Sequence, residues 1–157
     1  MRRFAICCAV VLIGCDKPKD QPAADAAADT PAPAAPAAPA PISLADVAGK
    51  WAVRTMNETG DSTLVSYEMV ASADSSAWNF TFPGRKPIPM RIIAVAGDSI
   101  VSESGPFESA LRKGVQVRVT QVLRLQDSKL MGTTTARYAT KSADSIAHLR
   151  LEGTRAP

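Results

Sequence analysis

Apolar and polar residues alternate with a period of two along most of the chain after residue 49. In one such segment Val117 and Val119 alternate with Arg118 and Thr120. Successive side chains of a strand point to opposite faces, so this pattern is typical of half-buried strands. Turn-forming residues separate the segments. The pattern predicts eight strands, at residues 51–55, 65–69, 78–82, 90–96, 99–103, 115–125, 129–140 and 147–152.

Eight short strands with short connections predict an all-β fold, an up-and-down antiparallel barrel or a sandwich. The exception is the stretch from Gly105 to Gly114, which has Pro106 near its start. Proline and glycine at these places are typical of the two ends of a short helix. Two interpretations stay open here: one helical turn that caps a barrel mouth, or an ordinary long connection.

An alanine- and proline-rich stretch precedes the strands. Residues 21–41 hold eleven alanines and six prolines, which disfavour a continuous helix. We expect a disordered spacer with polyproline-II character rather than a recognition peptide. The chain therefore divides into a leader at 1–14, a tether at 15–42 and a barrel domain at 43–157.

The first residues have the features of an export signal. Arg2 and Arg3 are basic, and residues 4–13 form an apolar run of ten. As a helix this run would rise about 15 Å, half of the roughly 30 Å hydrocarbon core of a bilayer. It is therefore too short for a transmembrane helix and fits the apolar part of a signal peptide.

Leu12-Ile13-Gly14-Cys15 resembles the lipobox of bacterial lipoproteins. The resemblance implies cleavage after Gly14, a thioether-linked lipid on Cys15 and usually an acyl chain such as palmitate on the new amino terminus. It also implies a place in the cell envelope, on a membrane facing the periplasm or the exterior. Asp16 resembles the inner-membrane retention signal of enteric bacteria, which favours the inner over the outer membrane. The alternative is a short uncleaved anchor with an incidental cysteine.

Cysteine usage agrees with this interpretation. Cys7 and Cys8 lie within the leader, so Cys15 is the only cysteine after cleavage. A mature domain with one cysteine has no disulfide framework and no cysteine zinc site.

Gly49-Lys50-Trp51, at the head of the first predicted strand, resembles the Gly-x-Trp motif of the lipocalin and wider calycin group. The resemblance implies an eight-stranded up-and-down barrel that binds small apolar ligands. It also implies that Trp51 packs at the closed barrel end under an arginine from late in the chain, which would be Arg155. The chain departs from true lipocalins because it is shorter and lacks their disulfides. Simple core packing is the alternative explanation of Trp51.

Signs of other chemistry are weak in this sequence. His148 alternates with apolar residues and is expected to face solvent, and a single histidine without cysteine cannot build an ordinary zinc site. The chain has no Gly-x-Ser-x-Gly elbow and no phosphate-binding glycine loop. Without the leader, 16 basic residues face 15 acidic ones and form no basic run. We expect no catalysis, cofactor, metal or nucleic-acid partner.

Two polar residues fall in register with apolar faces: Tyr67 between Val65 and Met69, and Gln121 between Val119 and Leu123. A buried polar group without a partner costs about 1–3 kcal/mol, so a ligand is one candidate partner for each. A rim tyrosine and a strand bulge are the alternatives.

The sequence thus predicts a membrane-anchored, non-catalytic barrel that binds a small apolar or amphipathic molecule. The alternative is a structural or protein-interaction module whose barrel is filled by its own side chains. An apolar cavity of a few hundred Å³ would favour the first interpretation. The oligomeric state stays open at this point.

Overall fold

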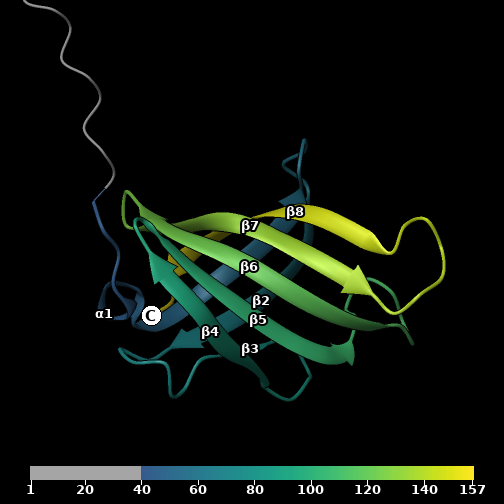
Figure 1. Cartoon of the computed structure of the whole chain (residues 1–157), viewed down its shortest axis with the longest axis horizontal. Helices are drawn as coiled ribbons and strands as arrows, with labels where there is room; N and C mark the ends of the chain where they lie inside the picture. Colours follow the sequence, from purple (N-terminus) through teal and green to yellow (C-terminus); the bar gives the residue numbers. More distant parts are fainter. Residues whose placement is uncertain (1–39) are drawn as a thin grey trace, which may run out of the picture. The chain divides into compact units, whose positions relative to one another are not determined.

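The computed structural model describes residues 40–157, which form a closed barrel of eight antiparallel strands (Figure 1). Each strand pairs with the next, and β1 pairs with β8 to close the barrel. The all-β, up-and-down antiparallel barrel predicted from the sequence is confirmed. The elements are α1 (Leu44–Val47), β1 (Gly49–Asn57), β2 (Thr63–Ala71), β3 (Asn79–Thr81), β4 (Ile88–Ala96), β5 (Ser99–Glu108), β6 (Gln116–Gln126), β7 (Lys129–Tyr138) and β8 (Ile146–Arg155).

The alternation in the sequence becomes the inside and the outside of the barrel. On β8, Leu149 and Leu151 are buried, whereas His148 between the apolar positions is exposed. On β6, Val119 and Leu123 are buried inside. Every strand of a closed barrel turns alternate side chains toward the same interior. The buried apolar residues form two clusters there, a large one around Trp51 and a smaller one of Val117, Val119, Ala136 and Tyr138.

The third strand is shorter than the alternation predicts. Trp78 and Phe82 fall outside β3, which keeps only three residues. The Trp78 indole N–H donates to the Ser72 carbonyl (3.0 Å) and the Asp74 carbonyl (2.7 Å). These bonds draw Trp78 into the connection that follows β2. As a result β3 pairs with β2 at only three positions and with β4 at only two.

The helical turn considered for the stretch 105–114 is wrong. Strand β5 continues to Glu108, and the register of β5 and β6 shifts between Ser104 and Phe107. Gly105 allows this bulge with a φ of +107°, and a Cβ there would lie 2.6 Å from the Val117 carbonyl oxygen. The connection 109–115 that follows contains no helix.

The short helix α1 was not among the predicted elements, although its capping signal is in the sequence. The Ser43 hydroxyl accepts a hydrogen bond from the Asp46 backbone N–H (3.3 Å), and the Asp46 carboxylate accepts one from the Ser43 N–H (2.7 Å). This reciprocal pair is a capping box. It fixes the first turn of α1, which directly precedes β1.

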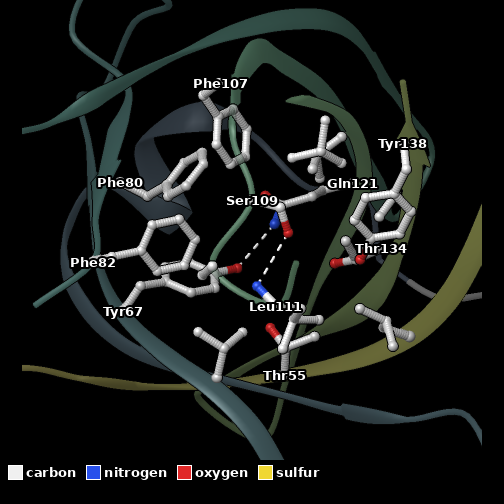
Figure 2. Close-up of a pocket in the computed structure, with 16 residues that line it drawn as sticks. Thr55, Tyr67, Phe80, Phe82, Phe107, Ser109, Leu111, Gln121, Thr134 and Tyr138 are labelled. Atoms are coloured by element: carbon white, nitrogen blue, oxygen red, sulfur yellow. Dashed lines mark hydrogen bonds between the residues drawn. The ribbon is translucent and has the colours of Figure 1, made fainter. Parts of the chain in front are cut away.

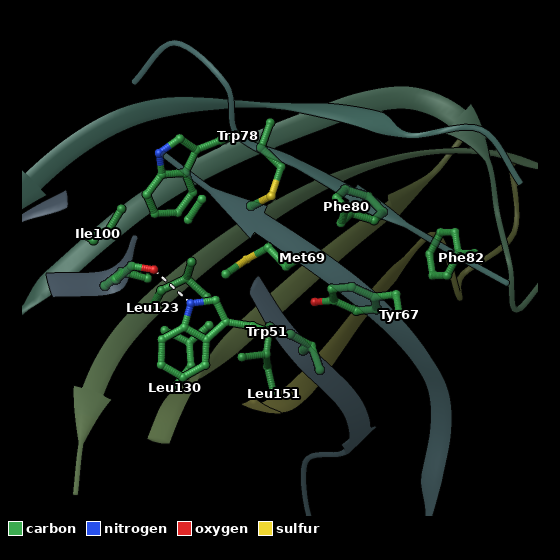
Figure 3. Packing of buried hydrophobic residues seen from close by; sticks show 14 residues of the cluster. Trp51, Tyr67, Met69, Trp78, Phe80, Phe82, Ile100, Leu123, Leu130 and Leu151 are labelled. Atoms are coloured by element: carbon green, nitrogen blue, oxygen red, sulfur yellow. Dashed lines mark hydrogen bonds between the residues drawn. The ribbon is translucent and has the colours of Figure 1, made fainter. Parts of the chain in front are cut away.

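Large, fully buried apolar side chains pack together in one half of the barrel; Figure 3 shows them together with Tyr67, Phe80 and Phe82 of the other half. We call the half with the large, fully buried side chains the closed end, because the start of β1 and the end of β8 meet there. The opposite end, which holds the connections 58–62, 82–87, 109–115 and 139–145, is called the mouth. The largest closed-end side chains, each at most 1% exposed, are those of Trp51, Met69, Ile100, Leu123, Leu130 and Leu151.

The predicted leader, Cys15 and the tether up to residue 39 lie outside the described residues. Within residues 40–157, no helix has the length and apolar character needed to cross a bilayer.

Candidate functional site

Trp51 lies at the closed end and is fully buried. Its indole N–H donates to the Val47 carbonyl of α1 (2.8 Å), which ties the helix to the core (Figure 3). The Arg155 guanidinium lies 4.5 Å from the centroid of the Trp51 ring, within the range of a cation–π contact. Arg155 also donates to the carbonyls of Ala48 (2.7 Å) and Asp46 (2.8 Å). The first and last strands are therefore locked together at this end.

Gly49 is the residue that allows this arrangement. Its φ is +125°, a conformation that residues with a side chain rarely adopt. A Cβ at this position would lie 2.9 Å from Arg155 Nη1. Gly49 and Trp51 of the Gly-x-Trp pattern thus both contact Arg155: Gly49 lets the arginine approach the backbone closely, and the Trp51 ring stacks on its guanidinium.

The mouth half of the barrel contains a pocket, shown in Figure 2. Its interior space is about 50 Å³, room for a few water molecules. This pocket is smaller than the apolar cavity of a few hundred Å³ that a ligand-binding barrel is expected to have. The pocket is lined by Thr55, Val65, Tyr67, Phe80, Phe82, Phe107, Ser109, Ala110, Leu111, Val117, Val119, Gln121, Thr134, Ala136, Tyr138 and Leu149.

Four aromatic rings form one wall of the pocket. Tyr67, Phe80 and Phe82 contact one another with ring centroids 5.2–5.6 Å apart, two of the three pairs edge to face. Phe107 joins them at 5.5 Å from Phe80. Such pairs stabilise each other beyond their buried area, so this wall is rigid and apolar.

Tyr67 and Gln121, the two polar residues singled out in the sequence, meet inside this pocket. Gln121 Nε2 donates to Tyr67 Oη across 2.8 Å, and both side chains are buried. Burial raises the pKa of Tyr67 to about 12, against the hydrogen bond from Gln121 that acts to lower it. Tyr67 is therefore neutral at physiological pH, and Gln121 forms no bulge: it pairs regularly with Ser102 and Thr134.

Two oxygen atoms of the pocket have no hydrogen-bond partner in the described part of the chain. They are Gln121 Oε1 and Thr134 Oγ1, on residues that face each other across β6 and β7. Both residues are about 95% buried. Leaving such a group unpaired costs about 1–3 kcal/mol. The pocket thus combines an apolar wall with two buried groups that can receive a hydrogen bond.

The connection 109–115 covers the pocket. Its Ser109 hydroxyl accepts hydrogen bonds from the backbone N–H groups of Leu111 and Arg112, both at 3.0 Å. Arg112 lies over the Tyr138 ring, 4.1 Å from its centroid. Leu111 lines the pocket, yet 40% of its surface is exposed. The cover is therefore held by the hydrogen bonds of the buried Ser109 and by the contact of Arg112 with Tyr138, while Leu111 stays partly exposed.

Sequence reasoning missed several members of this site. Thr134 is followed by Thr135 and Ala136 in the sequence, and only the β6–β7 register places Thr134 beside Gln121. Phe107 was assigned to a connection, whereas it is a strand residue. Thr134 carried one usable signal, since it falls in phase with the buried Ala136 and Tyr138.

Within residues 40–157, no three histidine, aspartate or glutamate side chains gather in a way that could hold a metal ion. No protein-family model matches the chain, and no curated protein or solved structure matches it significantly.

Proposed function

We propose that this chain is a lipid-anchored, non-catalytic barrel that binds a small amphipathic molecule in the mouth pocket. The observation that carries the proposal is the pair of unpartnered oxygens, Gln121 Oε1 and Thr134 Oγ1, facing an aromatic wall. A ligand with an apolar body and an O–H or N–H group would satisfy an oxygen that the barrel itself leaves unpaired.

The pocket volume restricts the ligand. About 50 Å³ accommodates a molecule of few atoms, or one end of a longer molecule. A longer ligand needs the cover to move, and Leu111, which lines the pocket, is 40% exposed. The proposal therefore favours a small phenol-like or short-chain alcohol over a bulky lipid.

Two further features support the proposal. The packing of Arg155 on Trp51 next to Gly49 has the arrangement that the calycin resemblance implies, and calycins are often binding proteins. The lipobox resemblance around Cys15 would put the barrel in the cell envelope, with Asp16 favouring the inner membrane. A tethered barrel at a membrane surface would meet small amphipathic molecules that partition there.

Phenol and toluene test the proposal, because they differ only by a hydroxyl in place of a methyl group. Each is titrated into the full chain in detergent solution, and binding is read from the NMR shifts of pocket methyl groups such as those of Leu149. We expect phenol to bind about tenfold more tightly than toluene, the ratio that one hydrogen bond of about 1.4 kcal/mol provides.

Substitutions then assign the effect to the two oxygens. Gln121→Leu and Thr134→Val should remove most of the preference for phenol. The matched control is Ser102→Ala, because Ser102 also has a buried hydroxyl without a partner but does not line the pocket. Equal affinities of the parent for phenol and toluene would contradict the proposed role of the two oxygens. If neither probe binds, the proposed binding function of the pocket is wrong.

A second candidate function is a protein-interaction module with a filled barrel. The small pocket volume favours it, because the closed end is packed with fully buried side chains and the mouth pocket offers only about 50 Å³. This candidate predicts that neither phenol nor toluene shifts the pocket methyl groups.

A further inference from the structure

Three of the four connections at the mouth, residues 82–87, 109–115 and 139–145, form a basic surface that we call the rim. The rim holds one acidic residue, Asp144, against five basic ones. The basic residues are Arg85, Lys86, Arg112, Lys113 and Lys141. Four of these side chains are exposed, and that of Arg112 is half-buried. This end of the barrel therefore presents an excess of positive charge to its surroundings.

The two arginines of the rim join its three connections without losing their charge. Arg85 Nη1 donates to the Glu108 carbonyl (2.7 Å) at the end of β5, and Arg112 Nη1 donates to the Asp144 carbonyl (2.8 Å). Both acceptors are uncharged backbone groups, so neither guanidinium is neutralised. Within residues 40–157, all four ion pairs use arginines outside the rim. The rim is therefore a continuous surface whose cations have no carboxylate partner in this part of the chain.

The connections at the closed end have the opposite charge, since each of them holds one aspartate and no basic residue. They are residues 72–78, 97–98 and 127–128. The acidic groups that border the rim are Glu58 and Asp61 of the fourth mouth connection and Glu108 of β5. Asp61 is bonded to Arg150 (2.6 Å), and the Glu108 carboxylate accepts the Gly114 N–H (3.1 Å). The positive charge of the connections is therefore confined to the mouth.

Exposed apolar side chains lie among the cations of the rim. Leu111 is 40% exposed and directly precedes Arg112 and Lys113 in the sequence. Ile146, which directly follows the connection 139–145, is 45% exposed. Segments that bind membrane surfaces combine basic side chains for anionic headgroups with apolar side chains that enter the boundary between headgroups and acyl chains. A soluble anion would pair with the cations but would leave both apolar side chains in water.

We propose that the rim docks the mouth of the barrel onto an anionic lipid bilayer. The exposed parts of Leu111 and Ile146 enter the headgroup region, and the five basic side chains face the lipid phosphates. The occupant is a bilayer because it offers negative charge and an apolar layer at one surface, which matches both features of the rim. This docking needs no ligand in the mouth pocket, so it is tested separately from the proposed ligand binding.

The described chain begins at the closed end, opposite to the rim (Figure 1). The Ile42 N–H donates to the carbonyl of Gly97, which lies in a closed-end connection (2.8 Å). The eleven residues of β6 span about 36 Å. An extended chain as long as the predicted tether, residues 15–42, reaches roughly 85 Å. The predicted lipid anchor and the rim can therefore reach the same bilayer.

A tryptophan on the rim reports the docking. Leu111→Trp adds an indole there, while Trp51 and Trp78 are buried and give the background signal of the parent. The matched control is Leu125→Trp, because Leu125 is 36% exposed but lies beside the closed-end connection that follows β6. The full chain of each variant is reconstituted into vesicles of phosphatidylglycerol and phosphatidylcholine, with and without bromine on the acyl chains. Bromine quenches an indole that enters the bilayer.

We expect brominated lipids to quench the added indole of Leu111→Trp about threefold more than that of Leu125→Trp, because interfacial side chains lie about 5–10 Å deep. Ile146→Trp, which does not line the pocket, should show the same excess. On vesicles of phosphatidylcholine alone the excess should disappear. Equal quenching of the rim and control indoles would overturn the proposal, and so would an excess that persists without anionic lipid.

Charge reversal separates the rim from the lipid anchor, which is the same in all these chains. Lys113→Glu with Lys141→Glu, added to Leu111→Trp, should weaken docking about 30-fold, the factor that two basic residues at about 1 kcal/mol each provide. The matched control is Lys50→Glu with Lys129→Glu, two exposed lysines at the closed end, which changes the net charge equally. Quenching that both pairs of substitutions reduce alike, or that neither pair reduces, would overturn the proposal.

Discussion

Gln121 on β6 and Tyr67 on β2 are 54 positions apart in the sequence, and Gln121 Nε2 lies 2.8 Å from Tyr67 Oη. Strands β2 and β6 are not neighbours in the barrel, so this hydrogen bond crosses the interior and links opposite walls. It also orients the Gln121 amide with Oε1 directed away from Tyr67 and without a partner in the described residues. The bond therefore sets both the width and the polarity of the mouth pocket.

Removing one partner of this hydrogen bond should lower the free energy of unfolding more than removing both partners. Tyr67→Phe leaves the Gln121 amide buried without its acceptor, which should lower the free energy of unfolding by about 1–3 kcal/mol. Adding Gln121→Leu to Tyr67→Phe should recover part of that loss, with a coupling energy of about 1 kcal/mol. Urea unfolding of the four chains of this double-mutant cycle measures the coupling. Strictly additive losses would show that the bond contributes nothing to stability.

Tyr67 should also make stability depend on pH in the alkaline range. Its pKa is raised by burial to about 12, whereas an unfolded tyrosine ionises near 10. Below pH 10 the contribution of this group is fully present, and it is lost as the pH rises from 10 to 12, because the unfolded chain alone releases the proton. The loss amounts to about 3 kcal/mol. Urea titrations at pH 9 and pH 12 should show this extra loss for the parent, and its absence for Tyr67→Phe; an equal loss in both chains would contradict the assignment.

Trp51 should be essential for the closed end. Truncation to alanine removes a fully buried indole and its bond to Val47, at a cost of about 3–5 kcal/mol. A domain of this size has a total stability of about 5–15 kcal/mol, so Trp51→Ala should melt far earlier or fail to fold. Leu64→Ala is the control, since Leu64 is partly exposed on β2 and should change stability by less than about 1 kcal/mol. A Trp51→Ala chain that melts like the control would exclude the closed-end role.

The barrel could be predicted from the sequence because its strands alternate clearly and their connections are short. Alternation is a local signal, and it predicts β6 to within one residue at each end, whereas it ends the last strand at residue 152 although β8 continues to Arg155. Alternation fails to predict a strand boundary where a tertiary contact determines it. Trp78 leaves β3 to donate to two carbonyls of the preceding connection. The continuation of β5 through Gly105 depends on a bulge against β6.

The candidate site was predictable only in part. Tyr67 and Gln121 could be identified as polar residues in apolar register, but nothing in the sequence says that they bond to each other. That contact depends on barrel closure, which brings together strands that are distant in the chain. Thr134 joins them through the register of β6 and β7, which is set by the turn at 127–128 rather than by its own neighbours.

Lipidation should depend on Cys15 alone. Cys15→Ser removes the thiol that the lipobox resemblance assigns to the anchor, so the chain should stay unlipidated and uncleaved after Gly14. Cys8→Ser is a matched control, because Cys8 lies in the apolar part of the leader. Metabolic labelling with a fatty-acid analogue, followed by a gel, measures both effects. Label on the Cys15→Ser chain at the parent level would contradict the anchor.

Native mass spectrometry of the full chain, released from its own membrane, tests the proposed ligand most directly. The account predicts a fraction of the parent with the added mass of one small amphipathic molecule. That added mass should disappear in Gln121→Leu and Thr134→Val and persist in Ser102→Ala, because only the first two line the pocket. A parent that carries nothing beyond its own chain and acyl groups would contradict the central claim that the mouth pocket binds a ligand.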